Sequence, residues 1–141
     1  MEPISFVVLI IVFLAIFLAV YTLLKAGKKG IDDGQQAFII TQWNLVEGEI
    51  KSRREISAIL NADKLLGHVL GLLGYEGSIG EKLKRIGESK ILTQDQLNRA
   101  WNAHKMRNKV AHEIGIKLSG KELDKTLSDF KSTLRILGVR F

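Results

Sequence analysis

The sequence predicts an all-α protein, an antiparallel bundle of four or five helices that follows one N-terminal transmembrane helix. Three observations lead to this prediction. A charge-free, almost entirely apolar segment occupies residues 4–24. After it, hydrophobic residues recur at helical spacing, and no segment alternates with the period of two that marks a strand. The single proline, Pro3, precedes all of these segments, so no proline breaks the helices expected after it.

Residues 4–24 have the length and composition of a transmembrane helix. At about 1.5 Å per residue the segment reaches roughly 31 Å, which matches a hydrocarbon core of about 30 Å. A cleaved signal peptide is the competing interpretation. It requires a basic stretch before the apolar segment, whereas this N-terminus carries Glu2 and neither Lys nor Arg. The residues at 21–24 are also too bulky for a cleavage site, so we expect an uncleaved anchor.

The basic residues beside this segment predict its orientation. Lys25, Lys28 and Lys29 follow it and nothing basic precedes it. The positive-inside rule then gives a single-pass cell-membrane protein with its N-terminus outside and its C-terminal domain in the cytoplasm. All 21 Lys and Arg but only 14 of the 15 Asp and Glu lie after the segment, which leaves the rest of the chain at +7. This charge favours a polyanionic partner, either nucleic acid or the anionic membrane surface.

We expect three parts: an anchor at 1–24, a basic, glycine-containing linker at 25–34 and a cytoplasmic helical domain at 35–141. The chain has no cysteine, which excludes disulfides, thiolate catalysis and cysteine-ligated zinc. Its three histidines form no i, i+4 pair and no HExxH motif. The sequence therefore predicts neither a metal site nor a cofactor.

The first two helices of the domain are expected from their apolar stripes. One stripe consists of Ile39, Trp43, Val46 and Ile50. The next helix, over residues 56–73, is apolar around much of its circumference, so we expect it in the middle of the bundle, with Gly74 just beyond its end.

Three further helices are expected from caps and apolar faces. A short helix over 79–86 precedes a turn around Gly87. Capping boxes predict helices over 94–112 and 121–137, and the pairs that form these boxes are Thr93 with Gln96 and Ser119 with Glu122.

The run of residues 107–112, Arg-Asn-Lys-Val-Ala-His, carries the groups that phosphodiester chemistry without a metal requires. Arg107 keeps its charge and can hold phosphate oxygens through two parallel hydrogen bonds. An imidazole can both take and return a proton in acid–base catalysis, which makes His112 the candidate for proton transfer. Candidate RNA contacts on the same helix are Arg99, Lys105 and Lys109, whereas Trp101 is expected in the core rather than as a base-stacking platform.

This spacing resembles the R-x4-6-H signature of HEPN domains, with Asn108 as the polar residue that often follows the arginine. Residues 59–66 and 101–105 also resemble small bacterial HEPN-like proteins, several of which join a helical bundle to one N-terminal membrane span. The resemblance implies a metal-independent endoribonuclease with a composite site at a homodimer interface. His112 would move protons, Arg107 would stabilise charge on the phosphorus, and Asn108 would orient His112 or contact the phosphate.

The helix itself separates these groups. Five residues correspond to about 140° of rotation, so Arg107 and His112 do not face each other on a regular helix. Asn108 does face His112, and His104 lies one turn back on the same stripe. One phosphate can therefore meet both groups only through a break near Gly115 or through a second copy of the chain.

Purely structural roles for these residues remain as alternatives. Asp63 interrupts an apolar stripe, and a carboxylate there is rarely buried unpaired. It could pair with Arg107, which would make the arginine structural, or with His104, Lys64 or Lys105. His112 could simply satisfy carbonyls at a helix end. The alternative function is a non-catalytic HEPN-like module that binds a nucleotide, RNA or a protein partner at the membrane, with an antitoxin or another regulator as a possible partner.

Overall fold

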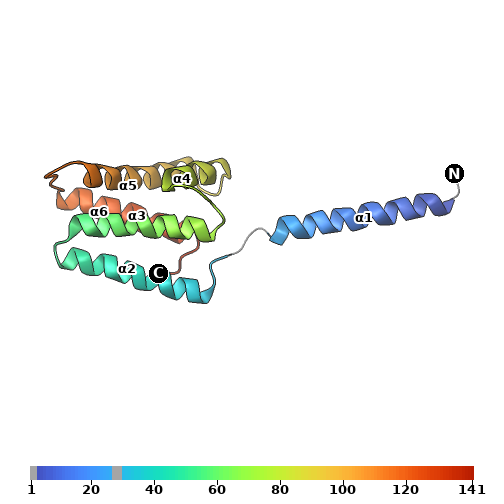
Figure 1. Ribbon diagram of the computed structural model, residues 1–141, viewed down its shortest axis with the longest axis horizontal. Helices are drawn as coiled ribbons and strands as arrows, with labels where there is room; N and C mark the ends of the chain where they lie inside the picture. Colours follow the sequence, from blue (N-terminus) through green and yellow to red (C-terminus); the bar gives the residue numbers. More distant parts are fainter. Residues whose placement is uncertain (1–2, 27–29) are drawn as a thin grey trace.

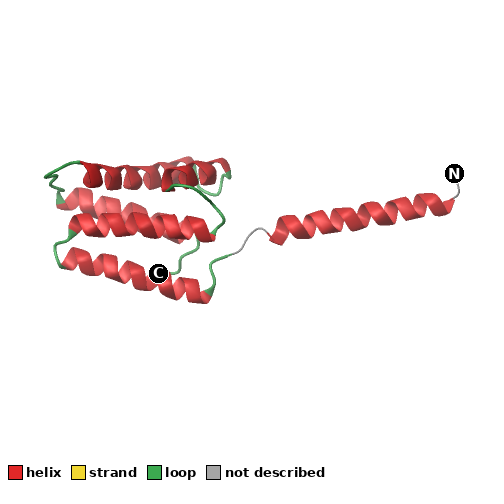
Figure 2. Cartoon of the chain, viewed as in Figure 1, coloured by secondary structure: helices red, strands yellow, loops and turns green. Residues whose placement is uncertain are grey.

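The computed structural model describes residues 3–26 and 30–141, and within the first helix it describes the side chains of residues 6–22. All regular structure in this part of the chain is helical (Figure 2), which confirms the all-α prediction. The helices are α1 (Pro3–Ala26), α2 (Asp33–Lys51), α3 (Glu55–Leu72), α4 (Ile79–Glu88), α5 (Gln94–His112) and α6 (Gly120–Ile136).

Helix α3 is the centre of the bundle. It packs against α2, α4, α5 and α6, and α5 additionally packs against α4 and α6 (Figure 1). Helix α3 runs opposite to α2, and α5 runs opposite to both α3 and α4, whereas α4 runs in the same direction as α3. The loops after α2 and after α5 therefore lie at the same end of the bundle. The expected helical bundle, with the second domain helix in its middle, is confirmed, and the antiparallel order holds for α2, α3, α5 and α6 but not for α4 beside α3.

The sequence of α3 explains its central position. Its side chains are buried on several sides, because the face of Ile59, Leu66 and Leu70 is flanked by small residues that let neighbouring helices approach. The helix ends as expected: Gly74 adopts φ +91°, and the Tyr75 amide donates to the Leu70 carbonyl.

The turn expected around Gly87 is wrong, because α4 continues through it to Glu88. Gly87 serves packing instead: a Cβ at this position would lie 2.7 Å from Leu97 Cδ2 of α5. The chain turns at residues 89–92, where Lys90 has φ +57°. The capping boxes at Thr93 and Ser119 are both confirmed, and they start α5 and α6 where the sequence places them.

The apolar N-terminal segment forms helix α1. It packs against none of the other helices, and its side chains from residue 6 to residue 22 are all exposed. Over the described ranges, no helix combines the length and the apolar character that crossing a membrane requires. The structure therefore does not support the transmembrane helix expected over 4–24, which stays a prediction. The expected linker, 25–34, shares two residues with α1 and two with α2, and its positions 27–29 lie outside the described residues.

Candidate functional site

The buried carboxylate of Asp63 joins α3 to α5. Asp63 has no exposed surface; its Oδ1 lies 2.8 Å from His104 Nδ1, and its Oδ2 lies 3.3 Å from Arg107 Nε. Oδ2 and Nε are buried, yet they are not aligned as a hydrogen bond, so charge attraction is what holds this second contact. Of the partners that the sequence leaves open, Asp63 takes His104 and Arg107, whereas Lys64 and Lys105 are exposed and form no ion pair with it.

Asn108 completes this group, which we call the Asp63 cluster (Asp63, His104, Arg107 and Asn108). Its Oδ1 accepts from Arg107 Nη1 at 3.0 Å, and its Nδ2 lies 3.4 Å from His104 Nε2. The neutral ring fits these contacts if Nδ1 carries the proton donated to Asp63 and Nε2 accepts from Asn108. The side chain of Arg107 remains 30% exposed, and its Nη2 has no partner among the described residues.

His112 lies outside the Asp63 cluster. It is the last residue of α5, it is exposed, and no described side chain pairs with it. The helix is continuous up to this point, and Gly115, with φ +73°, comes only after its end. One chain therefore does not bring Arg107 and His112 together, and Asn108 contacts His104 rather than His112.

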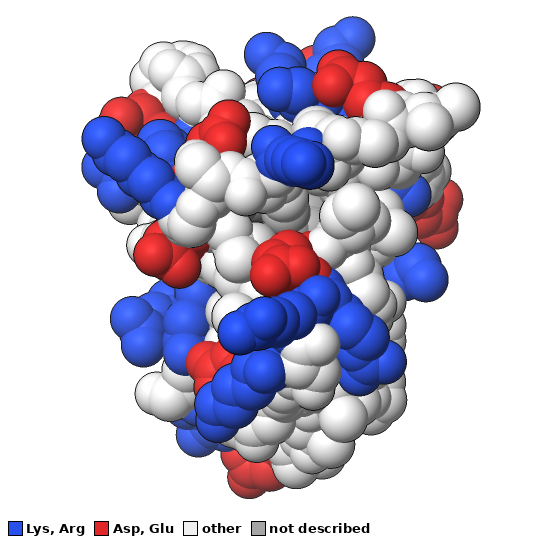
Figure 3. Space-filling model, turned by 90° about the vertical axis from the view of Figure 1, so that its left-hand side faces the viewer, with Lys and Arg blue, Asp and Glu red and all other residues white. Residues whose placement is uncertain are grey.

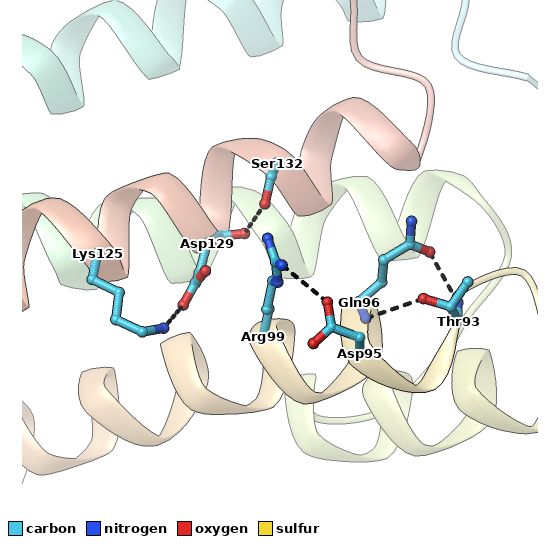
Figure 4. A network of polar contacts seen from close by, with 7 residues as sticks. All are labelled: Thr93, Asp95, Gln96, Arg99, Lys125, Asp129 and Ser132. Carbon is cyan, nitrogen blue, oxygen red and sulfur yellow. Dashed lines mark hydrogen bonds and ion pairs between the residues drawn. The ribbon is translucent and has the colours of Figure 1, made fainter.

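The predicted RNA contacts lie along the other side of α5, on the face toward α6 and solvent. Lys105 and Lys109 are exposed and have no ion-pair partner in the described part of the chain. Arg99 is already paired, at 3.0 Å, with Asp95 (Figure 4). After Asp95 the sequence has no acidic residue until Glu113, so the rest of α5 is basic or neutral.

A groove between α5 and α6 borders this face. Residues of both helices line two hollows of about 340 and 370 Å³, and an adjoining hollow of about 570 Å³, which shares residues with both, is lined by α5 alone. The acids of the α6 wall are engaged: Asp129 pairs with Lys125 at 2.6 Å (Figure 4). Hydrogen bonds from the Ser119 amide and hydroxyl lower the pKa of Glu122 below its usual value of 4.5. On the α5 side of the groove, Lys105 and Lys109 are therefore the cations that have no ion-pair partner among the described residues.

The end of the bundle that carries the loops after α2 and α5 has a mixed charge. Figure 3 shows basic side chains there in several groups, with acidic side chains between them. Exposed cations of this end include Lys51, Arg53 and Arg54, while Glu113 and Asp124 are exposed acids. Because basic and acidic side chains are mixed at this end, it is a weaker candidate for binding an anionic partner than the acid-free face of α5.

Sequence reasoning missed Asn98 and Asn102. Both are exposed on α5 and line the groove beside Lys105. Their spacing was a usable signal, because positions 98, 102, 105 and 109 form one helical stripe of amides and ammonium groups.

No protein-family model matches the chain, and neither a curated protein nor a solved structure does. The fold class is confirmed by the helices themselves. Membership of the HEPN family stays a prediction that depends on the motif and on the type of bundle.

Proposed function

We propose that this protein is a HEPN-like module that binds RNA through the exposed face of α5. The supporting observation is the acid-free stretch between Asp95 and Glu113, which exposes Lys105, Lys109 and His112 beside asparagine amides. The positive charge of lysines attracts phosphates, and amides form hydrogen bonds to phosphates, sugars or bases. The Asp63 cluster lies on the opposite flank of the helix and fixes α5 against α3.

Cleavage of that RNA is the second candidate, and the arrangement of Arg107 favours it. Asp63 and Asn108 hold two nitrogens of the guanidinium, while Nη2 and part of the side chain stay accessible. A cation fixed in this way is oriented before a phosphate arrives. His112 of a second protomer would have to supply the proton transfer, so this candidate requires a homodimer.

Binding is tested with the full-length chain in detergent micelles and a fluorescently labelled single-stranded RNA of mixed sequence. The Lys105→Gln/Lys109→Gln variant should lose most of its affinity, because both unpaired cations of the face are gone. The matched control is Lys51→Gln/Lys64→Gln, which removes the same charge from α2 and α3. Equal affinities of the two double variants would overturn the proposal. Binding of anionic vesicles instead of RNA would assign the face to a membrane surface.

Cleavage is tested with the same RNA in excess EDTA, by comparing the wild-type chain with His112→Ala and with Arg107→Ala. A composite site predicts that the wild type cuts the RNA, that each single variant fails, and that a mixture of the two variants regains part of the activity through mixed dimers. Identical cleavage by all samples would indicate a contaminating nuclease. A chain that stays monomeric at high concentration in micelles would exclude the composite site.

We propose α1 as the anchor of this module in the cell membrane, with the helical domain on the cytoplasmic side. The support is that its side chains at 6–22 are exposed and almost all apolar, and that no other helix covers them. The full chain should remain with the membrane fraction after alkaline washing, and a chain that lacks residues 1–24 should not. Release of both by the wash would contradict the anchor.

A further inference from the structure

Trp101 belongs only in part to the core in which the sequence places it. One part of the indole packs against the hydrophobic core, and its ring centroid lies 6.1 Å from that of His104, edge to face. The residue is only partly buried, however, and it lines the 570 Å³ hollow together with Asn98, Asn102 and Lys105. Its Nε1 has no hydrogen-bond partner among the residues that the structure describes.

The polar groups of this hollow are available. Asn102 and Lys105 have no partner in the described part of the chain, and Asn98 accepts one hydrogen bond, from Gln94 Nε2 at 3.0 Å. No acid lines the hollow, in contrast to its two neighbours along the groove. An aromatic ring, two amides and one ammonium group of α5 therefore line one open hollow that has no carboxylate in its lining.

These groups match the parts of one nucleotide. An aromatic ring stacks on a base of any identity, amides bond the polar edge of a base, and a lysine attracts the adjoining phosphate. With one ammonium group the hollow is poorly equipped for a dense polyphosphate. In a duplex the bases are stacked on each other and cannot reach a protein side chain in this way.

We propose that this hollow is a subsite for one unpaired nucleotide, whose base lies against Trp101, whose edge meets Asn98 and Asn102, and whose phosphate meets Lys105. The partner of α5 is then single-stranded RNA rather than duplex RNA. This inference rests on the proposed function and adds to it the substrate class and the position of one base.

Fluorescence of Trp101 reports the stacking directly. The chain has two tryptophans, so Trp43→Phe leaves Trp101 as the only one. Titration of that full-length variant with a single-stranded oligonucleotide should quench the emission over the same concentration range in which the RNA binds. Inorganic polyphosphate and a duplex of the same length should leave the emission nearly unchanged. Equal quenching by polyphosphate would overturn the subsite.

Two substitutions test the same point by affinity. Trp101→Ala should weaken binding of single-stranded RNA by roughly 5- to 150-fold, the range measured for loss of one stacked base. Because Trp101 also packs on the core, Asn102→Ala is the second variant: it is exposed, and it should weaken binding roughly 5-fold with unchanged unfolding. The matched control is Asn44→Ala, an exposed amide on α2.

The outcomes separate the two proposals. Loss of affinity in the lysine double variant with no effect of Asn102→Ala, and equal binding of single-stranded and duplex RNA, would keep RNA binding and remove the subsite. Failure of every RNA to bind would remove both.

Discussion

The substitution Asp63→Asn should destabilise the bundle by about 2–3 kcal/mol. Hydrogen bonds to charged groups contribute about 1.5–3 kcal/mol, and breaking a buried ion pair costs about 3–5 kcal/mol. We expect the lower range because asparagine can still accept a hydrogen bond from His104, and because 30% of the Arg107 side chain already contacts water. For a domain of this size the melting temperature should fall by about 8–12 °C.

Urea unfolding of the full-length chain in micelles, followed by tryptophan fluorescence, measures this loss. Both tryptophans, Trp43 and Trp101, lie in the bundle, so α1 does not contribute to the signal. The control is Asp124→Asn, an exposed acid on α6 that should change stability by less than about 0.5 kcal/mol.

A second variant identifies the cause. If Asp63→Asn acts by leaving Arg107 buried without its counter-charge, then adding Arg107→Met should recover part of the lost stability. A loss below about 0.5 kcal/mol for Asp63→Asn, or a strictly additive double variant, would refute the ion-pair reasoning.

Two further predictions concern the helices. Gly67→Ala should cost about 1–3 kcal/mol in urea unfolding, because its Cβ would lie 2.8 Å from Ile79 Cγ1. Gly48→Ala, which has open space in α2, should gain about 0.5–1 kcal/mol, and a loss there would contradict this reasoning. The capping hydrogen bonds lower the pKa values of Glu81 and Glu122 below 4.5. Their stabilisation is therefore present above pH 4.5 and lost as the pH falls through the lowered values. Unfolding curves recorded at successive pH values should show this loss, and Glu81→Gln/Glu122→Gln should flatten it; parallel pH profiles would count against the caps as its cause.

Local signals in the sequence predicted the helices well where backbone chemistry and burial agree. The capping boxes at Thr93 and Ser119 mark the starts of α5 and α6 because serine and threonine satisfy amides that no helical carbonyl can reach. Gly87 shows where such signals fail. A glycine can serve a turn or a close contact between helices, and only the position of Leu97 on a neighbouring helix distinguishes the two.

The candidate site was harder to predict because its contacts are long-range. The sequence showed that Asp63 needs a partner, but the packing of α3 on α5 decides that His104 and Arg107 supply the contacts. The exposure of Trp101 was also hidden. Gly80 of the short helix α4 packs against the edge of the indole, where a Cβ would lie 3.7 Å from Trp101 Cη2, and the side chain as a whole remains only partly buried.

The dependence of RNA affinity on salt tests binding by α5 most directly. For single-stranded RNA the slope of log K against log salt changes by about 0.7 for each phosphate contact that a cation makes. Lys105→Gln/Lys109→Gln should therefore reduce the slope of the full-length chain by about 1.4, while Lys51→Gln/Lys64→Gln should leave it unchanged. Equal slopes for the wild type and the α5 variant would contradict RNA binding through this face.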